Sequence, residues 1–525
     1  MNEFIARYQD QLSGVITGFD RLVFRGNLAL NHEVGMKGFL WVKGVAWKDY
    51  ARYVTEISQR VKQASLASLE ELKRPIRYLP SGKQSKEEMA RTIAREDHIG
   101  SGPVCAFTAV EPCSSWRVVG NRQTQKLQLL RGMRQCLFVY HYWIDPVFGF
   151  MSARLQTWFP FTLYVYMNGR EWLARQMDRE GMKYLRHDNC FSWIDDFARA
   201  QSLMDEQLTT DWASALNGCV ERMHPLFPEL CEKYPMNYYW TSFQSEWAMD
   251  MVFRDPQQLQ RLYPQLIHLG MVSFSSSDVM RFMDKKVSRK GDAVSPSAHE
   301  VISDLKIRPE GVRIKHRLGK NSIKLYDKAY CERGAVLRAE LTMNAAGQFW
   351  AFRHKTGQTE GQQQWLPLRA GIADLHRRTE VSQKAIDRYY TALAKVDDTT
   401  TLGELAAPLE QRVRWNRQWV RALHPFEPGD LALLRAVNRG EFVIHGMRNR
   451  DLQALLYNTP PATKQEARRR SAAISRKLRL LRAHGIIQKL PHTHRYQVTA
   501  QGRLTLNAIL SAQRTTTQQL TTLAA

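Results

Sequence analysis

Two neighbouring segments of alternating residues could place five reactive side chains on one surface. In the segment SIKLYDK, the side chains of Lys324, Tyr326 and Lys328 point to the same side of an extended chain, because neighbouring side chains alternate. In the segment VLRAELT, Arg338 and Glu340 alternate with apolar residues in the same way. A phenol, two ammonium groups, a guanidinium and a carboxylate together suit chemistry at a phosphate group.

The surrounding residues, 311–344, predict three short antiparallel strands that would position these groups. The turn at 319–321 contains Gly and Asn, which tolerate positive φ. The apolar sides of the strands would pack on a core and leave the polar side on one sheet surface. The same pattern also fits a packed hairpin whose polar side is a lattice of salt bridges with Tyr326 lying over it.

Two further carboxylates could complete a metal site. Glu246 and Asp250 lie four residues apart in the aromatic segment 236–253, so they share a face whether the segment is a strand or a helix. Together with Glu340, they predict a site for Mg²⁺ or Mn²⁺, which prefer oxygen ligands. An exposed acidic edge on an aromatic core segment is the alternative interpretation.

The chemistry predicted for this surface is transfer of a nucleic-acid strand. A tyrosine that attacks a phosphodiester must lose its proton, and its unperturbed pKa is about 10. Lys324 and Lys328 would stabilise the phenolate of Tyr326. The covalent phosphotyrosine link would conserve the energy of the broken bond for religation.

The two segments resemble a motif of rolling-circle replication initiators, in which a strand of the form I-Y-x-K precedes one of the form R-x-E. In the plasmid type of these proteins, the tyrosine nicks DNA. The resemblance implies that Tyr326 is the nucleophile, Lys328 its neighbour, and Arg338 with Glu340 the second-strand pair. It is confined to these strands, and the N-terminal region has no His-hydrophobe-His metal motif.

The remainder of the chain predicts an α+β protein with a large mixed α/β N-terminal region and an antiparallel sheet. Asn168 and Gly169 predict the start of a helix whose polar side carries Arg170. The predicted domains are an α/β region at 1–180, the helical and antiparallel region with the candidate site at 181–400, a linker helix at 401–427, and a C-terminal domain at 428–525.

The C-terminal domain predicts three helices, two short strands and a final helix. Gly485 is placed to end the third helix. This order, and the segment LRLLRAHGIIQKLPHTHRYQVTAQGR, resemble a winged helix-turn-helix with its recognition helix and wing. The resemblance implies that these basic residues contact nucleic acid: Arg468, Arg469, Arg470, Arg476, Arg479, Arg482, His494 and Arg495.

Composition points to a polyanionic partner. The 525 residues carry a formal net charge of +24, which favours DNA, or alternatively RNA. The most apolar stretch is too short to cross a membrane, and the N-terminus has no secretory h-region, so we expect a cytoplasmic protein without a membrane partner. Seven cysteines without a CxxC pair predict reduced thiols and no structural zinc.

Three hypotheses follow. The first is a metal-dependent DNA-nicking and strand-transfer protein of a mobile element or replicon, targeted by its winged helix. The second is a DNA- or RNA-binding protein without enzymatic activity, such as a transcriptional regulator. The third is a metal-dependent nuclease without a covalent step. The sequence leaves the oligomeric state open.

Overall fold

The chain divides into two compact units, each built from separate stretches of sequence, in the computed structural model. The sheet unit contains Asp10–Pro256 and Leu325–Ile386, and the terminal unit contains Met1–Gln9, Gln257–Lys324 and Asp387–Ala525. The structure describes residues 2–80, 85–274, 276–284, 301–308, 311–331, 334–355, 362–394, 402–439, 442, 446–457, 459–490 and 493–514.

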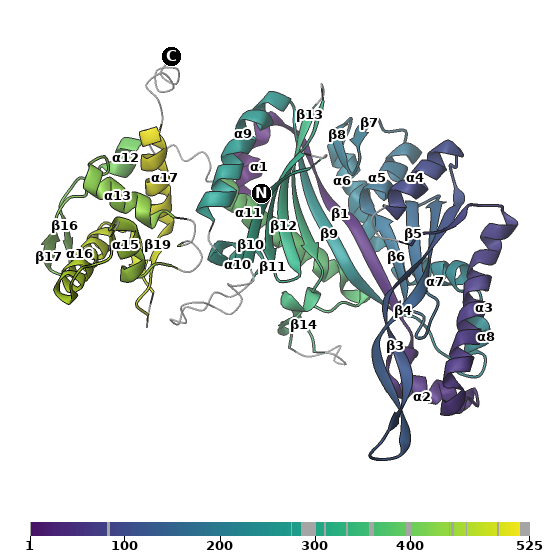
Figure 1. Cartoon of the computed structure of the whole chain (residues 1–525). Coiled ribbons are helices and arrows are strands. Elements are labelled where there is room, and N and C mark those ends of the chain that lie inside the picture. Colours follow the sequence, from purple (N-terminus) through teal and green to yellow (C-terminus); the bar gives the residue numbers. More distant parts are fainter. Residues whose placement is uncertain are drawn as a thin grey trace. The chain divides into compact units, whose positions relative to one another are not determined.

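Long, mostly antiparallel strands form the sheet unit (Figure 1). The eleven strands of the large sheet follow the order β10-β11-β12-β13-β9-β1-β6-β5-β4-β3-β2, and the boundary between the units falls inside β12. In the sheet unit, β1 is antiparallel to both β6 and β9, whereas β2 is parallel to β3. The strands that belong at least partly to this unit are β1 (Leu12–Asn27), β2 (Ile76–Tyr78), β3 (Gly102–Asn121), β4 (Lys126–Asp145), β5 (Gly149–Gln156), β6 (Leu163–Asn168), β9 (Tyr239–Phe253), β12 (Asn321–Cys331) and β13 (Gly334–Met343).

Helices and small hairpins cover the faces of this sheet. Helix α3, for example, packs Leu66 and Leu69 against Ala106 of β3 and Val139 of β4. The helices are α2 (Glu33–Val42), α3 (Tyr50–Glu71), α4 (Lys86–Glu96), α5 (Gly169–Arg179), α6 (Phe197–Glu206), α7 (Trp212–Met223), α8 (Phe227–Cys231) and α11 (Leu375–Leu393), the last of which crosses the unit boundary. The small hairpins are β7 (Tyr184–His187) with β8 (Cys190–Ile194), and β14 (Trp350–Arg353) with β15 (Gln364–Pro367).

Helix α5 begins where the sequence predicts it and lies unusually close to β1. The Asn168 side chain caps the helix by accepting hydrogen bonds from the backbone N–H groups of Arg170 and Glu171. A Cβ atom at Gly169 would lie 1.9 Å from the backbone oxygen of Phe19, so only glycine permits this approach. The close contact brings the first turn of α5 onto the strand, and Arg170 is buried there rather than on the polar side of the helix as the sequence predicts.

Gly169→Ala is expected to lower the unfolding temperature of the protein, because the new methyl group forces helix and strand apart at a cost of about 1–3 kcal/mol or more. Gly218→Ala is the matched control, since a Cβ at this position in α7 has no neighbour within 4 Å. Alanine favours a helix interior over glycine by up to about 1 kcal/mol, so the control is expected to be neutral or stabilising. Thermal unfolding followed by circular dichroism compares the two; equal unfolding temperatures would contradict the close approach.

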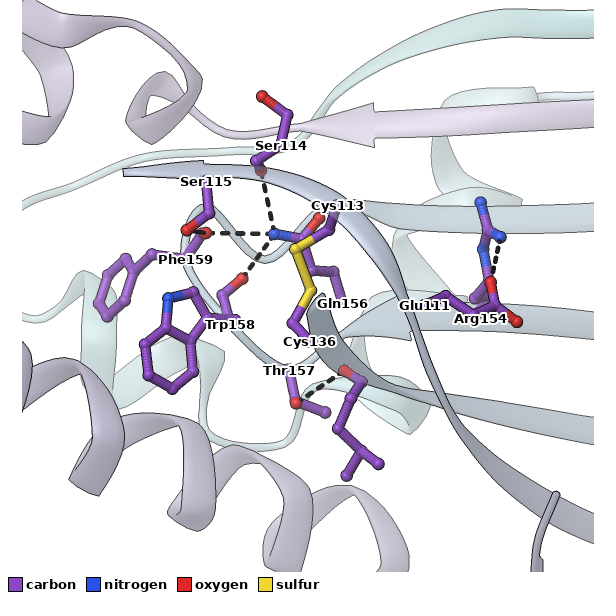
Figure 2. The surroundings of a disulfide bond; sticks show 11 residues. Glu111, Cys113, Ser114, Ser115, Cys136, Arg154, Gln156, Thr157, Trp158 and Phe159 are labelled. Atoms are coloured by element: carbon purple, nitrogen blue, oxygen red, sulfur yellow. Dashed lines mark hydrogen bonds and ion pairs between the residues drawn. A yellow bond between two sulfur atoms is a disulfide. The ribbon is translucent and has the colours of Figure 1, made fainter. Parts of the chain in front are cut away.

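A disulfide joins the two longest strands of the sheet unit (Figure 2). Cys113 on β3 and Cys136 on β4 are bonded, with their Cα atoms 6.3 Å apart. The prediction of reduced thiols is therefore wrong for this pair. The register sets Cys136 opposite Glu111, two residues from Cys113, so both thiols project from one face of the hairpin. Sequence alternation does not reveal which residues of two strands face each other.

The terminal unit holds the predicted C-terminal order of elements. Helix α16 ends before Gly485, whose φ of +71° is the left-handed conformation expected after a helix. A buried cluster that includes Leu434, Ile474 and Leu478 forms the core of this region. Its elements are α12 (Leu402–Ala406), β16 (Val413–Trp415), β17 (Gln418–Val420), α13 (Pro428–Val437), α15 (Asn449–Leu456), α16 (Lys464–Ala483), β18 (Ile487–Lys489), β19 (Tyr496–Val498) and α17 (Ala500–Arg514).

The other elements of the terminal unit come from the beginning and middle of the chain. They are α1 (Glu3–Tyr8), α9 (Pro256–His268, whose first residue is the last of the sheet unit), α10 (Ser276–Phe282), β10 (Val301–Arg308) and β11 (Gly311–Leu318). In the part of the chain that the structure describes, no helix combines the length and apolar character needed to cross a membrane.

The structure confirms the α+β class and corrects two local predictions. The three strands predicted over 311–344 form as β11, β12 and β13, and Gly319 has a φ of +57° in the first turn. However, all ten residues of β13 are buried, so its polar side is not a sheet surface. The linker helix predicted at 401–427 is also wrong, because α12 is short and the hairpin β16–β17 follows it. The tryptophans and arginines of this segment lie on the two paired strands, where Arg414 is opposite Trp419, and not along a helix.

Candidate metal centre on the sheet

The predicted reactive residues gather on one buried side of strands β12, β13 and β9. The register pairs Arg338 with Asp250 and Thr342 with Glu246, so these four side chains leave the same side of the sheet. Helices α5 and α6 and strand β8 cover this side: Ile16 of β1 packs on the two helices, and Val336 packs on Cys190. Figure 1 shows α5, α6, β7 and β8 grouped beside β1.

Three carboxylates, which we call the acidic cluster, form the centre of the site. Asp20 of β1, Glu246 of β9 and Glu340 of β13 each offer an oxygen atom, and these atoms lie within 4.8 Å of one another. The Thr342 hydroxyl donates toward Glu340 at 3.3 Å and lies 3.5 Å from Glu246. Three carboxylate oxygens at this spacing are the ligand type and arrangement that Mg²⁺ and Mn²⁺ bind in proteins.

A β-bulge turns Asp20 toward the other two carboxylates. The pairing of β1 with β9 shifts between Phe19 and Arg21, so Asp20 is the extra residue with no partner opposite it. Its Oδ2 atom accepts a hydrogen bond from the Asn189 amide at 2.7 Å. Its Oδ1 atom is buried and has no hydrogen-bond partner among the described residues. A buried carboxylate oxygen without a donor is costly unless a cation balances it.

Asp250 lies in a different environment from the three carboxylates. Its oxygen atoms form ion pairs with Arg338 Nε at 2.8 Å and with Arg170 Nη2 at 2.9 Å. All three side chains are almost fully buried. The structure thus brings Glu246 and Glu340 together, as the metal prediction requires, but it places Asp250 between two guanidinium groups and puts Asp20 in the acidic cluster.

Arg338 links the ion pairs to the acidic cluster. Its side chain is fully buried, and its Nη1 atom lies 3.6 Å from Asp20 Oδ2. Burial alone would lower the pKa of Arg338, but the neighbouring carboxylates of Asp20, Asp250 and Glu340 outweigh it and raise the pKa. Arg338 therefore remains a cation and balances part of the negative charge around the cluster. This position suits a fixed counter-charge better than direct contact with a substrate.

Lys328 of β12 is linked to the acidic cluster, and Tyr326 lies beside Lys328. Lys328 Nζ donates to Asn189 Oδ1 at 2.6 Å, and the same Asn189 side chain donates to Asp20, so two hydrogen bonds join Lys328 to the cluster. Lys328 also lies 3.8 Å from Asp188 and 5.4 Å from the centre of the Tyr326 ring. Tyr326 is buried, and Lys324 is half-buried on the same side of the strand.

The sheet unit also contains a cavity of about 950 Å³ that is lined by neighbours of Lys328 and Arg21. Glu87 and Arg91 of α4, Glu171 of α5 and Asp188 of the β7–β8 turn are among its lining residues. Asp188 is 82 % exposed and lies beside Lys328, while Glu87 lies 3.7 Å from Arg21, the residue opposite Glu246. Two of its lining residues thus contact Lys328 and Arg21, while the three carboxylates themselves are not among the lining residues.

The arginines at 468–482 that are predicted to contact nucleic acid lie on helix α16, whereas His494 and Arg495 lie between β18 and β19. Arg470 is held by Glu466 and stacks on Tyr457 at 4.7 Å. Arg479 and Arg482 lie over the ring of Trp415. The exposed members of the predicted set are Arg468, Arg469, Arg476, Arg479 and His494, whereas Arg470, Arg482 and Arg495 are half-buried.

Sequence reasoning missed Asp20, Asn189 and Arg170. Asp20 carries a readable signal, because it is an acid in the middle of the apolar strand segment VITGFDRLVFR. A charged residue at such a position needs a buried partner or a ligand. Asn189 and Arg170 have no comparable signal: one lies in a two-residue turn, and the other is buried only because Gly169 allows α5 to approach β1.

Comparison with known proteins leaves the function to be argued from the site. No protein-family model matches the chain, and no curated protein matches it. Among solved structures, it is similar to the di-domain ARO/CYC StfQ from the steffimycin biosynthetic pathway, with 10 % identity and a TM-score of 0.14 over 60 % of this chain and 94 % of that one. A TM-score this low does not indicate a common fold.

Proposed function

We propose that the chain is a DNA-binding enzyme of a mobile element or replicon that nicks a DNA strand and transfers it through Tyr326. A divalent cation, Mg²⁺ or Mn²⁺, would be held by Asp20, Glu246 and Glu340. The observation that carries this proposal is the cluster of three carboxylates, which is joined to Lys328 through Asn189, with Tyr326 beside Lys328. The net charge of +24 supports a polyanionic substrate.

The residues of the cluster fit such a cation. All three ligands are carboxylates, and the buried Asp20 Oδ1 has no donor among the described residues. When bound, the cation would polarise the scissile phosphate and offset its negative charge. Arg338 and Thr342 hold the surrounding oxygens in place through the contacts described above. Glu246 is the half-buried member of the cluster and would be the ligand nearest to the substrate.

Tyr326 would act as the nucleophile. Its phenol proton is lost to solvent or to a neighbouring base, and the ammonium groups of Lys324 and Lys328 stabilise the resulting phenolate. The phenolate oxygen forms a bond to phosphorus while the bond from phosphorus to the leaving sugar oxygen breaks. The leaving oxygen takes up a proton, and the DNA end remains attached to the protein as a phosphotyrosine ester.

The C-terminal part of the terminal unit would select the DNA. Three helices, a two-stranded hairpin and a fourth helix follow one another in the order of a winged helix-turn-helix. Helix α16 would lie in the major groove, with the exposed Arg468, Arg469 and Arg476 near phosphates or base edges. Arg470 and Arg482, which are held by internal contacts, would shape the helix rather than contact bases directly.

The decisive experiment compares the parent protein with Tyr326→Phe on a supercoiled plasmid that carries the native flanking DNA. With Mn²⁺ or Mg²⁺, the parent is expected to produce nicked circles with covalently attached protein. Loss of one hydroxyl from Tyr326 should abolish both products, while thermal unfolding shows that the variant is folded. Tyr53→Phe, which changes a half-buried tyrosine on helix α3 of the sheet unit, is the matched control and should nick like the parent.

Two other outcomes would replace this proposal. Nicked DNA that is free of protein, formed equally by Tyr326→Phe, would indicate a hydrolytic nuclease that uses the carboxylates without a covalent step. Salt-dependent binding with no metal-dependent scission would indicate a binding protein without enzymatic activity.

A further inference from the structure

A second cavity of the sheet unit lies at the end of β1 and is basic. It has a volume of about 520 Å³, and Arg25, Arg131, Asn31, Tyr239 and Thr241 are among its lining residues. No Asp or Glu is among the described residues that line it. A cavity with two guanidinium groups and no carboxylate is complementary to an anion.

Hydrogen bonds fix Arg131 in this cavity without neutralising it. Its Nη1 and Nη2 atoms donate to the backbone and side-chain oxygens of Asn31, and its Nε atom donates to the Ser114 hydroxyl at 2.8 Å. The guanidinium also lies 5.6 Å from the ring of Trp116. All these partners are uncharged, so the positive charge of Arg131 is not balanced by them. Its position is set before any ligand arrives, which lowers the entropic cost of binding.

Arg25 adds a second charge with unused donors. Its Nε atom donates to Asn27 Oδ1 at 3.0 Å, and this is its one hydrogen bond to the described residues. A guanidinium has five N–H donors, so those on both terminal nitrogens remain available. Burial lowers the pKa of Arg131, and the nearby charge of Arg25 lowers it further, as expected when two cations share a site. An anion between them would relieve this repulsion.

Aromatic rings flank the two arginines. Arg25 lies 5.8 Å from the ring of Phe243 and 6.0 Å from that of Tyr164, and these rings contact each other edge to face. Phe243 is 44 % exposed, and Tyr239 at the cavity rim is 66 % exposed. Exposed rings beside cationic groups are the arrangement that stacks unpaired bases and binds the adjoining phosphates in single-stranded nucleic acids.

Strand β1 contributes a residue to both places: Arg25 lines the cavity, and Asp20 belongs to the acidic cluster. Arg21, opposite Glu246, and Arg25, opposite Thr241, are four residues apart on β1. At the rise of a β-strand, this separation is roughly 13 Å. Side chains of Arg21 and Arg25 point to the same side because β1 pairs in regular register with β6 between them. One extended nucleic-acid strand could therefore reach both places.

We propose that the cavity between Arg25 and Arg131 binds a backbone phosphate of a single-stranded nucleic acid, with neighbouring bases stacked on Tyr239 and Phe243. The strand would continue along β1 toward the carboxylates, and this last part rests on the proposed function. Paired bases cannot present their faces to these rings, so the cavity is a site for single strands, in contrast to the duplex site proposed for helix α16.

The test measures binding of a fluorescein-labelled dT20 oligonucleotide by anisotropy, with the full-length protein in EDTA. Without a divalent cation the measurement does not depend on cleavage. Arg25→Gln and the double variant Arg25→Gln/Arg131→Gln are expected to weaken binding about tenfold or more. Because one phosphate contact is lost, the slope of log K against log salt, which is negative, should decrease in magnitude by about 0.7. Tyr239→Ala should weaken binding about fivefold or more.

Arg122→Gln is the matched control, because it removes the same charge from an exposed turn of the sheet unit. It should change affinity less than twofold. Thermal unfolding verifies that each variant is folded. If loss of the Arg131 hydrogen bonds unfolds the double variant, the single variant Arg25→Gln is sufficient to test the proposal. A 20-base-pair duplex measured in parallel should bind all variants alike.

The inference would be overturned if Arg25→Gln and Arg122→Gln bound dT20 equally, or if duplex and single strand lost affinity together. Failure of the proposed function looks different. If the parent protein binds dT20 but does not nick DNA, and Arg25→Gln weakens this binding, then the single-strand site is present and only the proposed cleavage chemistry is wrong.

Discussion

Asp20→Asn is expected to remove most of the stabilisation of the protein by Mn²⁺. Asp20 provides one of the three carboxylates of the acidic cluster, and its buried Oδ1 atom has no donor among the described residues. Removing the charge of a direct ligand should lower metal affinity at least as much as the loss of an outer-shell contact, about a hundredfold. The parent should gain about 2.7 kcal/mol when Mn²⁺ is present at a hundred times its Kd, and the variant should gain about 0.4 kcal/mol or less at the same concentration.

Asp250→Asn is the matched control for this prediction. It also removes one buried carboxylate from the same side of the sheet, but that carboxylate pairs with Arg170 and Arg338. We expect a lower unfolding temperature without metal and an unchanged increase on addition of Mn²⁺. Differential scanning calorimetry with and without Mn²⁺ measures both. The opposite result, with the increase lost in Asp250→Asn and kept in Asp20→Asn, would support the ligand set predicted from the sequence.

Arg338→Met is expected to destabilise the sheet unit by about 3–5 kcal/mol. The substitution leaves the carboxylate of Asp250 with a single cationic partner and removes the counter-charge 3.6 Å from Asp20, both in fully buried positions. Leaving a buried charge without its partner has this cost because desolvation is no longer offset. Urea unfolding followed by tryptophan fluorescence measures the change, since Trp172 and Trp247 are buried in the same unit.

Arg122→Met provides the comparison for Arg338→Met. It makes the same chemical change at an exposed position on the β3–β4 turn and should alter stability by less than about 0.5 kcal/mol. A loss below about 1 kcal/mol for Arg338→Met would mean that water or rearrangement compensates the carboxylates. Arg338 would then not be an essential counter-charge of the site.

Local alternation was enough to predict the strands that carry the site. The period of two in SIKLYDK and VLRAELT assigned Tyr326, Lys328, Arg338 and Glu340 to one side, and the strands β12 and β13 have these residues within them. The α+β class followed from the same kind of pattern. Alternation reports on one strand at a time, however, and the candidate site is built from four strands.

Long-range pairing explains what the sequence did not reveal. From the sequence, Asp250 is assigned to the metal site because Asp250 and Glu246 share a face of their strand. The shared face is correct, but the residue opposite Asp250 on the neighbouring strand is Arg338. Which residue lies opposite another is set by register, and a bulge shifts that register at Asp20. Likewise, nothing within β13 shows that β8, α5 and α6 bury its polar side.

The candidate site joins residues that are synthesised far apart. Glu246 follows Asp20 by 226 residues, and Glu340 follows Glu246 by 94. Strand β1 must therefore remain unpaired on one edge until β9 has left the ribosome, and β9 must wait in turn for β13. Such non-local pairing is slow and exposes strand edges to aggregation during synthesis. It also means that a nascent or prematurely terminated chain that ends before β13 lacks Glu340, so an incomplete protein does not carry the complete set of three carboxylates.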